Sequence, residues 1–285
     1  MKPRLWPRRT TDRISATFAR SRREGRAAFI PFVMAGDPSL REMPDLLGAL
    51  AAGGADLIEL GVPFSDPIAD GPINQRAATR ALRAGTTLSG ILQLVAESRD
   101  RIDVPIVLFT YFNLIHRRGI ARFAEQAAAS GVDGVLCVDL PPEEAEEEVA
   151  PVLTANGIDP IFLLAPTSTE DRIKSVVRAS RGFVYYASRT AVTGEKATLP
   201  PELLGELRRL RRRVKLPIAV GFGISTPEQA AAVGGVADGV IVGSALVRVI
   251  EEHGGDPGLP ALLEVRVREL ASAVRPGALE AMEAW

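Results

Sequence analysis

Two carboxylates, Glu59 and Asp70, lie eleven residues apart in the segment DLIELGVPFSDPIADGP, residues 56–72. Glu59 interrupts an apolar run typical of a buried strand, and a carboxylate is almost never buried without a partner. Burial raises the pKa of such a group, which suits a residue that donates and accepts a proton near neutral pH. Asp70 follows in a loop, where it can remain ionised. The pair predicts acid/base catalysis; the alternatives are a glutamate satisfied by a buried donor and a turn aspartate before Gly71.

Glycine-rich turns follow three of the apolar runs, in the segments AVTG at 191–194, GFGIS at 221–225 and VGSALV at 242–247. Glycine lets backbone N–H groups approach an anion, and the last segment also leads through a serine into an expected helix. A single turn of this kind would indicate only a tight bend. Three of them at the ends of neighbouring expected strands predict a phosphate site.

The lysines and histidines argue against several other chemistries. Lys174 falls in an expected helix, Lys215 before an expected strand and Lys196 in a loop, so no lysine is placed to form a Schiff base. His116 and His253 are far apart and lack carboxylate or cysteine spacing around them, so neither a metal site nor a Ser-His-Asp triad is expected. The expected reaction is carboxylate acid/base catalysis on a phosphorylated compound.

A repeated unit of strand and helix must position these groups. Eight short apolar runs are expected strands, at 27–34, 56–60, 105–111, 134–138, 160–165, 182–188, 217–222 and 239–243. Segments with helical spacing lie at 39–53, 119–131, 141–157, 167–182, 200–214 and 226–235. This alternation predicts parallel strands covered on both faces, and eight units predict an α/β fold, the (β/α)8 TIM barrel. An open doubly wound sheet is the alternative, although no GxGxxG sequence follows the first run.

In a barrel the active site is built at the carboxyl ends of the strands. Few polar residues fall there, and they are Glu59, Asp66, Asp70, Tyr111, Asp139, Tyr185, Ser188 and Arg189. Alternation along a strand places Ile58 and Leu60 on one face and Glu59 on the other. Glu59 therefore points into the barrel if Ile58 and Leu60 pack under the helices.

The 285 residues are expected to form one domain, with 1–12 as a loose leader and an extra helix at 13–25, where Ile14, Phe18 and Ala19 share a face. A formal net charge of -1 with interspersed charges favours neither nucleic acid nor a membrane surface as partner. The basic start lacks the apolar core of a secretory signal, so a cytoplasmic location is expected, with an organellar transit segment as the alternative. The one cysteine, Cys137, is expected to be a small buried hydrophobe.

Five segments, FIPFVMAGDP, DLIELGVPFSDPIADGP, YYASRTAVTG, GFGIS and VGSALV, in this order resemble tryptophan synthase alpha chains. The resemblance runs from about Arg13 to the C-terminal helix. It implies a lyase of L-tryptophan biosynthesis that cleaves indole-3-glycerol phosphate to indole and glyceraldehyde 3-phosphate, with no metal or cofactor bound to this chain. Protonation of the indole ring at C3 would supply the electron sink that an imine or a metal provides in other aldolases.

The resemblance also implies roles for individual residues. Glu59 would handle the C3 proton and the departing side-chain hydroxyl, Asp70 would accept the indole N–H, and Tyr185 would support both carboxylates. Substrate would be bound by Phe32, Tyr111, Leu136 and Phe222 in an apolar wall, by Thr193 bonded to Asp70, and by Gly194, Gly223, Gly243 and Ser244 around the phosphate. For the apolar wall, ordinary barrel packing is the alternative interpretation.

The implied partner is a pyridoxal-phosphate beta chain that receives indole through a tunnel in an alpha2beta2 tetramer. The loop holding Pro63 and Asp66 matches the contact side, and residues 189–196 match a lid that excludes water. A stand-alone lyase that releases free indole, a non-catalytic regulatory subunit that binds phosphate ligands, and a phosphorylated-sugar isomerase are the alternatives. The apolar pocket argues against the isomerase, and the two carboxylates argue against the regulatory subunit.

Four positions depart from the family pattern. Ala191 stands where the lid usually has glycine, and an alanine forced to positive φ costs roughly 1 kcal/mol. Met34 replaces a usual threonine, Val138 a usual alanine or proline, and Asn74 a usually apolar residue. None of these changes removes a proton-transfer group, so they are interpreted as tuning of the pocket and lid.

Overall fold

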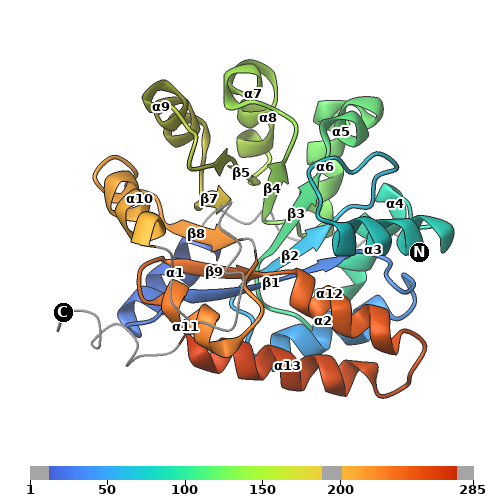
Figure 1. Ribbon diagram of the computed structural model, residues 1–285. Coiled ribbons are helices and arrows are strands. Elements are labelled where there is room, and N and C mark those ends of the chain that lie inside the picture. The colour runs from blue at the N-terminus through green and yellow to red at the C-terminus, as the bar shows by residue number, and fades with distance from the viewer. Residues whose placement is uncertain (1–12, 188–200, 222, 275–285) are drawn as a thin grey trace.

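The computed structural model describes residues 13–187, 201–221 and 223–274 of the chain. Within these residues nine parallel strands curl into a nearly closed barrel surrounded by helices (Figure 1). The strands are β1 (Ala28–Met34), β2 (Ile58–Gly61), β3 (Ile106–Thr110), β4 (Gly134–Cys137), β5 (Asp159–Ile161), β6 (Leu163–Leu164), β7 (Val184–Ala187), β8 (Ile218–Gly221) and β9 (Gly239–Val242). The predicted TIM barrel is confirmed, and the open doubly wound sheet is excluded.

The two strands at the ends of the sheet are joined directly by the chain. The strand order is β5-β4-β3-β2-β1-β9-β8-β7-β6, so the two end strands are neighbours in sequence, separated only by Phe162. β5 pairs with β4, and β6 pairs with β7. The predicted strand at 160–165 is therefore divided in two, whereas each of the other seven predicted runs forms a single strand.

Helices surround the barrel, with the first of them across one end. They are α1 (Arg13–Arg23), α2 (Met43–Ala52), α3 (Pro72–Arg83), α4 (Leu88–Ser98), α5 (Phe112–Arg118), α6 (Ile120–Ser130), α7 (Pro142–Glu148), α8 (Ala150–Ala155), α9 (Glu170–Ala179), α10 (Pro201–Arg211), α11 (Pro227–Gly234), α12 (Ser244–His253) and α13 (Leu259–Ala273). The segment 141–157, predicted as one helix, is broken into α7 and α8. Pro151 explains the break, because it has no N–H to donate and its ring would clash with the carbonyl four residues earlier. No helix in the described part of the chain is long and apolar enough to cross a membrane.

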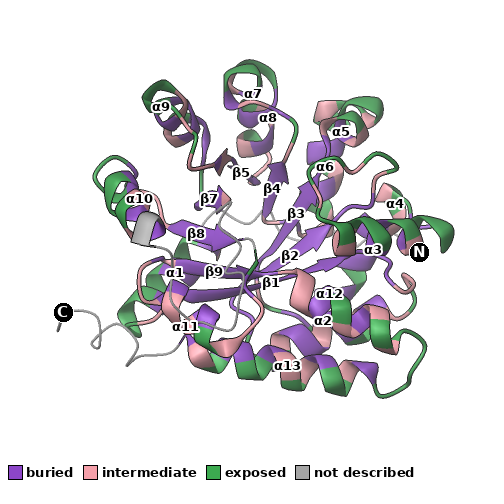
Figure 2. Cartoon of the chain, viewed as in Figure 1, coloured by how far each residue is buried: buried purple, intermediate pink, exposed green. Residues whose placement is uncertain are grey.

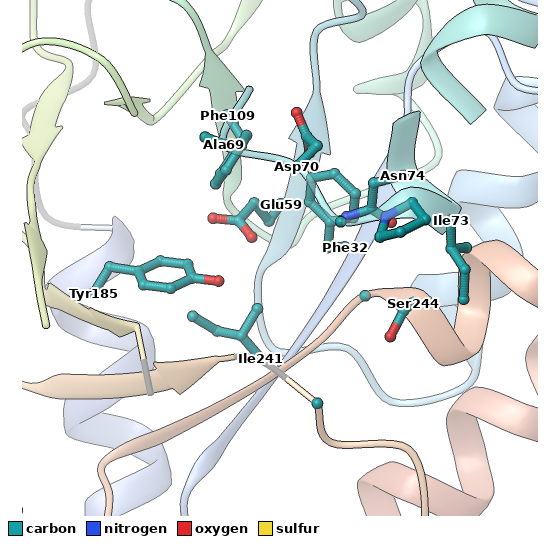
Figure 3. A pocket seen from close by; sticks show the side chains of 14 residues that line it. Phe32, Glu59, Ala69, Asp70, Ile73, Asn74, Phe109, Tyr185, Ile241 and Ser244 are labelled. Carbon is teal, nitrogen blue, oxygen red and sulfur yellow. The ribbon is translucent and has the colours of Figure 1, made fainter. Parts of the chain in front are cut away.

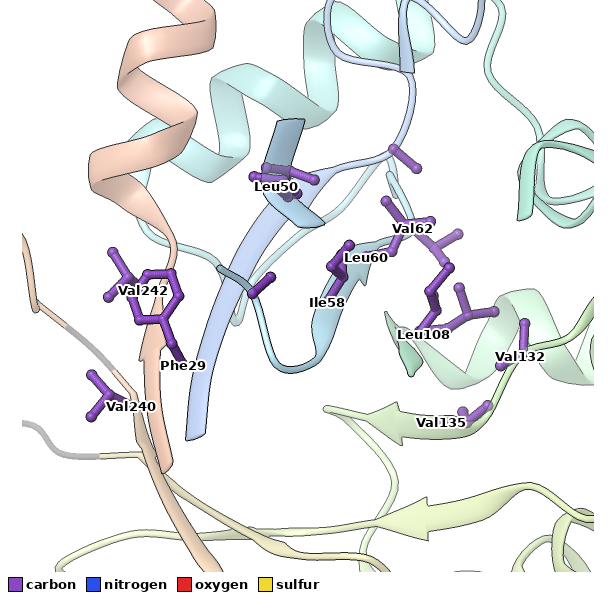
Figure 4. Packing of buried hydrophobic residues seen from close by; sticks show 14 of the residues in the cluster. Phe29, Leu50, Ile58, Leu60, Val62, Leu108, Val132, Val135, Val240 and Val242 are labelled. Carbon is purple, nitrogen blue, oxygen red and sulfur yellow. The ribbon is translucent and has the colours of Figure 1, made fainter. Parts of the chain in front are cut away.

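Alternation of side chains along the strands produces two apolar layers. Ile58 and Leu60 of β2 face outward and belong to the cluster between the strands and the helices (Figure 4). Residues of the opposite face, such as Phe32 and Ile241, form a second cluster inside the barrel. Figure 2 shows the strands almost entirely buried, while the surrounding helices carry exposed residues on their outer faces. Glu59, between Ile58 and Leu60, therefore points into the barrel, as predicted.

α1 closes the amino end of the barrel, where the strands begin. Ile14 and Phe18 belong to the interior cluster, and the Phe18 ring lies 5.4 Å from that of Phe183. A Cβ atom on Gly134, the first residue of β4, would lie 2.9 Å from Cδ1 of Ile14. One on Gly239, the first residue of β9, would lie 3.1 Å from Cε1 of Phe18. The predicted extra helix thus plugs the end of the barrel opposite to the loops that follow the strands.

The buried face of α1 includes Ile14 and Phe18, as predicted, but not Ala19. Its buried residues are Ile14, Thr17, Phe18 and Ser21, whereas Ala19 is exposed. The prediction for Ala19 is wrong, because a spacing of three and four residues defines one helix face and Ala19 lies five residues after Ile14.

Candidate active site

Glu59 lies on the inner face of β2, between two strands that fix its position. In the parallel register it is opposite Phe32 of β1 and Val107 of β3. Only 1% of Glu59 is exposed, and its Oε1 atom has no hydrogen-bond partner among the described residues. Burial, and secondarily the negative charge of Asp70, raises the pKa of Glu59 from 4.5 to about 8. The side chain is therefore mostly protonated at neutral pH and is able to donate a proton.

Asp70 lies in the loop between β2 and α3 and is held by its neighbours. The Tyr111 hydroxyl donates a 2.7 Å hydrogen bond to Oδ2 of Asp70. The backbone N–H of Ala69 donates to the same hydroxyl oxygen at 3.1 Å, which fixes the orientation of the phenol. Burial raises the pKa of Asp70 above its ordinary value, while hydrogen bonds from Tyr111 and Asn74 act in the opposite direction. These two donors favour the ionised carboxylate.

Tyr185 on β7 faces Glu59 across the barrel. Figure 3 shows the hydroxyl of Tyr185 and the carboxyl group of Glu59 pointing toward one another. Burial, followed by the charges of Glu59 and Asp70, raises the pKa of Tyr185 well above its ordinary value, so the hydroxyl stays protonated. Gly221 on the neighbouring strand β8 makes room for it, since a Cβ atom at this position would overlap the Tyr185 hydroxyl. Glycine is thus required beside Tyr185 for steric reasons.

A cavity of about 390 Å³ joins these groups at the carboxyl end of the barrel (Figure 3). It is lined by Phe32, Glu59, Ala69, Asp70, Gly71, Pro72, Ile73, Asn74, Phe109, Tyr185, Gly223, Ile241, Gly243 and Ser244. Its apolar part includes Phe32 and Phe109, whose rings pack edge to face with centroids 5.5 Å apart. An apolar wall with a few converging polar groups is typical of a small-molecule site, and this one fits a flat aromatic ring beside the carboxylates.

Another part of the cavity lining has the features of an anion site. Gly243 immediately precedes α12, and Ser244 is the first residue of that helix. The first turn of a helix presents unpaired N–H groups and the positive end of the helix dipole. Gly223, two residues after the end of β8, has φ of 76°, a conformation that favours glycine. These elements together can bind a phosphate group through backbone N–H groups.

The other predicted site residues fall into three groups. Thr193, Gly194 and Phe222 lie outside the described residues, as do Ala191 and the rest of the predicted lid. Tyr111 and Leu136 are buried, but neither is among the described residues that line the cavity; Tyr111 reaches it through Asp70, and Leu136 packs in the interior cluster. In the loop after β2, Pro63 is buried whereas Asp66 is exposed.

The cavity also contains residues that the sequence did not single out for binding. Phe109 and Ile241 line its apolar wall, and Ile73 and Asn74 come from the first turn of α3. Strand alternation could have identified Phe109, because it lies two residues after Val107, whose neighbour in register is Glu59. The first turn of α3 carried no such signal, since no helix was predicted there.

The remaining reactive groups lie away from this chemistry. Cys137 is buried, as predicted, and burial raises the pKa of its thiol above the ordinary value. Asp139 accepts a 2.7 Å hydrogen bond from the backbone N–H of Phe112, at the start of α5. Within the described ranges, no group of three or more His, Cys, Asp and Glu side chains is arranged to hold a metal ion.

Comparison with known proteins finds one family over nearly the whole chain. The family profile described as "Tryptophan synthase alpha chain" matches residues 18–275. The tryptophan synthase alpha chain of Geobacter sulfurreducens is 52% identical over 240 residues, which are 84% of this chain and 90% of that protein. The alpha chain of Solibacter usitatus is 49% identical over 258 residues, covering 90% of this chain and 96% of the relative.

Solved structures agree with the sequence relatives. The tryptophan synthase subunit alpha of Legionella pneumophila superposes with a TM-score of 0.85 and 36% identity, over 92% of this chain and 98% of that one. A chain of tryptophan synthase from M. tuberculosis, in an aminoacrylate- and BRD0059-bound form, gives a TM-score of 0.82 and 36% identity. The match covers 94% of this chain and all of that chain.

Proposed function

The chain belongs to the tryptophan synthase alpha chain family, and from this premise we propose that Glu59 and Asp70 carry out its proton transfers and charge stabilisation. It is an alpha subunit of tryptophan synthase, a carbon–carbon lyase of tryptophan biosynthesis. The reaction cleaves indole-3-glycerol phosphate to indole and glyceraldehyde 3-phosphate. The observation that carries the proposal is the buried Glu59 carboxyl group, with Oε1 unpartnered among the described residues, in the wall of a cavity large enough for a small substrate.

Glu59 acts first as an acid and then as a base. Its raised pKa keeps the carboxyl group protonated at neutral pH, so it donates a proton to C3 of the indole ring. The resulting carboxylate accepts the proton of the hydroxyl on the side-chain carbon attached to C3. The bond between C3 and that carbon breaks, its electron pair returns to the ring, and the hydroxyl-bearing carbon becomes the aldehyde. One carboxyl group thus serves both transfers and ends as it began.

Asp70 stabilises the charge that this protonation creates. Protonation at C3 leaves positive charge on the ring nitrogen, and an ionised carboxylate that accepts the N–H bond stabilises it most in the transition state. Hydrogen bonds from Tyr111 and Asn74 favour the ionised form of that carboxylate, and the bond from Tyr111 orients it. Tyr185 remains neutral beside Glu59 and supports the carboxyl group without competing for its proton.

Gly223, Gly243 and Ser244 bind the phosphate group of the substrate in this proposal. The N-terminus of α12 supplies backbone donors and a favourable dipole. Thr193, Gly194 and Phe222 are assigned to substrate binding from the family resemblance alone, and Phe32 with Phe109 forms the apolar wall against the indole ring.

The family implies a tryptophan synthase beta chain as the partner of this chain. We infer a tetramer of two alpha and two beta chains, with pyridoxal phosphate in the beta chain and no cofactor in this one. The loop after β2 contributes Ala69 and Asp70 to the cavity lining and carries Asp66 and Ile68 exposed, with Ile68 80% exposed. We expect this loop, including Pro63, to face the beta chain. A cytoplasmic location is part of the same proposal, because a phosphorylated substrate does not cross membranes unaided.

Product formation tests the function directly. The purified chain is incubated with indole-3-glycerol phosphate, and indole and glyceraldehyde 3-phosphate are measured separately. Equal amounts of the two products are expected, with faster release after a beta chain is added. Binding of the substrate without either product would exclude the lyase and support a regulatory subunit. Cleavage at a rate unchanged by a beta chain would exclude the complex and support a stand-alone lyase.

A further inference from the structure

Asn74 places a carboxamide group in the active-site cavity. The residue lies in the first turn of α3, and its side chain is among those that line the cavity (Figure 3). Its Oδ1 atom is buried and has no hydrogen-bond partner in the part of the chain that the structure describes. A buried carbonyl oxygen without a donor is costly, and such atoms in folded proteins are normally satisfied by protein, water or ligand. The position of this oxygen therefore points to a ligand that donates a hydrogen bond.

The orientation of the amide follows from its neighbour. The hydrogen bond from Asn74 favours the ionised form of Asp70, so the NH2 group of Asn74 is the end directed at that carboxylate. Oδ1 is then the end left for another group. Figure 3 draws Asn74 between Asp70 and Ser244, that is, between the proposed ring-binding and phosphate-binding groups.

The chemistry of the substrate leaves one donor for this oxygen. Indole-3-glycerol phosphate has three neutral donors: the ring N–H and two side-chain hydroxyls. In the proposed function Asp70 accepts the ring N–H, and Glu59 accepts the proton of the hydroxyl next to the ring. The phosphate, as an anion, accepts hydrogen bonds and is bound by backbone donors. The hydroxyl on the middle carbon of the side chain is the remaining donor.

We propose that Asn74 is a specificity-determining residue, whose Oδ1 accepts a hydrogen bond from the middle hydroxyl of the glycerol phosphate side chain. The inference rests on the proposed function and deepens it, because it assigns a partner to the one substrate donor that Glu59 and Asp70 do not use. It gives Asn74 two roles in one amide: the NH2 group positions Asp70, and the oxygen selects a hydroxylated substrate over its deoxy analogue.

Two unreactive ligands that differ in one hydroxyl group test this inference. Indole-3-propanol phosphate carries the ring and the phosphate without side-chain hydroxyls, and its 2-hydroxy derivative adds only the middle one. Dissociation constants are measured by calorimetry for the full-length wild type, Asn74→Leu and Asn74→Ala. In both variants the loss of the NH2 group beside Asp70 affects the two ligands alike, because both donate the ring N–H, whereas the loss of Oδ1 affects only the hydroxy ligand. The affinity for the hydroxy ligand relative to the deoxy ligand is therefore expected to fall about tenfold.

A matched control lies on the same helix. The hydroxyl of exposed Thr79 donates to the carbonyl oxygen of Gln75 at 2.9 Å and takes no part in the cavity, so Thr79→Ala should bind both ligands as the wild type does. Equal weakening of both ligands in the Asn74 variants, or no weakening of either, would overturn the inference. Melting temperatures show whether each variant is folded. If Asn74→Leu does not fold, the comparison of the two ligands is made with Asn74→Ala.

The cleavage assay keeps the two proposals apart. If the wild type forms no products, the proposed function fails whatever the Asn74 variants bind. If the wild type cleaves the substrate and the Asn74 variants do not discriminate between the two ligands, only the present inference fails. Steady-state kinetics give an independent readout: Asn74→Leu should raise KM through the lost contact to the middle hydroxyl, whereas Tyr111→Phe, which disturbs only Asp70, should raise KM less.

Discussion

The hydroxyl of Tyr111 donates a 2.7 Å hydrogen bond to Oδ2 of Asp70, which joins the end of β3 to the loop after β2. Tyr111 was predicted to form part of an apolar wall, and its ring does stack on Phe64, with centroids 4.9 Å apart. The contact that bears on the reaction is nevertheless polar. It holds Asp70 in one orientation and favours its ionised form.

Replacing Tyr111 by Phe should lower kcat/KM by about tenfold while leaving the fold intact. The phenyl ring can still stack on Phe64, so the lost element is the hydrogen bond to Asp70. Because that bond lowers the pKa of Asp70, its loss should raise this pKa and move the acidic limb of the pH profile of kcat/KM to higher pH. An unchanged acidic limb would show that Tyr111 does not position Asp70.

Gly221→Ala should reduce activity strongly, because the added methyl group overlaps the hydroxyl of Tyr185, which faces Glu59. Gly48→Ala is the matched control: it lies inside α2, where nothing is within 4 Å of the added Cβ. The control should leave kcat/KM unchanged and raise stability by about 0.5–1 kcal/mol, as alanine does in helices. Tyr185→Phe in the Gly221→Ala chain should recover part of the lost activity. Wild-type kinetics in Gly221→Ala alone would contradict the steric account.

Arg80→Leu should destabilise the chain by about 3 kcal/mol at neutral pH. Arg80 on α3 donates two hydrogen bonds, of 2.8 and 2.7 Å, to Asp37, which is 1% exposed. Its loss leaves a buried carboxylate without its cation. The penalty should shrink as the pH falls, because Arg80 lowers the pKa of Asp37 and the unpaired carboxyl group protonates more readily.

Urea unfolding of Arg80→Leu at pH 5 and pH 7 measures that dependence. Arg101→Leu serves as the control, since its partner Asp45 is 3.3 Å away and both side chains are about two-thirds exposed. An exposed pair of this kind contributes between zero and about 1 kcal/mol. Equal losses in the two variants would mean that the burial of Asp37 has no energetic consequence.

The sequence predicted the barrel because its strand runs are short, apolar and separated by helical spacing. The apolar residues Ile58 and Leu60 predicted the inward direction of Glu59, since a strand has only two faces and alternate residues lie on opposite ones. The features of the site that the sequence did not predict depend on contacts between segments that are distant along the chain. The bond between Tyr111 and Asp70 joins residues 41 positions apart, and no local pattern encodes it. Asn74 was noted as a departure from the family pattern and interpreted as tuning of the pocket and lid, because its place in the cavity depends on the packing of α3.

Two elements were predicted with the wrong boundaries, and each error has a local physical cause. Pro151 ends what the composition of 141–157 predicted as a single helix. The strand predicted at 160–165 is divided at Phe162, where one part pairs with β4 and the other with β7. Apolar spacing reports which residues are buried, but it does not report the neighbour with which a strand pairs.

Glu59→Gln should make the chain more stable, by an amount that depends on pH. The pKa of Glu59 is raised from 4.5 to about 8, so between these values the folded chain holds a proton that the unfolded chain has released. Stability therefore falls as the pH rises through this window. Glutamine removes the titrating group, so urea midpoints of the two proteins should differ least near pH 5 and most above pH 8. A constant difference would contradict the raised pKa.

The same pKa predicts the alkaline limb of activity. If protonated Glu59 donates to C3, kcat/KM of the isolated chain should fall as the pH rises above about 8. Rates are measured with indole-3-glycerol phosphate from pH 5 to 10, with stability monitored in parallel. A rate that rises steadily through pH 8 would assign the proton donor to another group.

Single-turnover cleavage by Glu59→Gln tests the central claim most directly. Glutamine keeps the shape of the side chain but can neither donate a carboxyl proton nor accept one. The rate of indole formation should fall by at least about 10²- to 10⁴-fold, whereas binding of indole-3-propanol phosphate should stay within about threefold of the wild type. Cleavage within about tenfold of the wild-type rate, equivalent to about 1.4 kcal/mol of barrier, would contradict the assignment of Glu59 as the proton-transfer group.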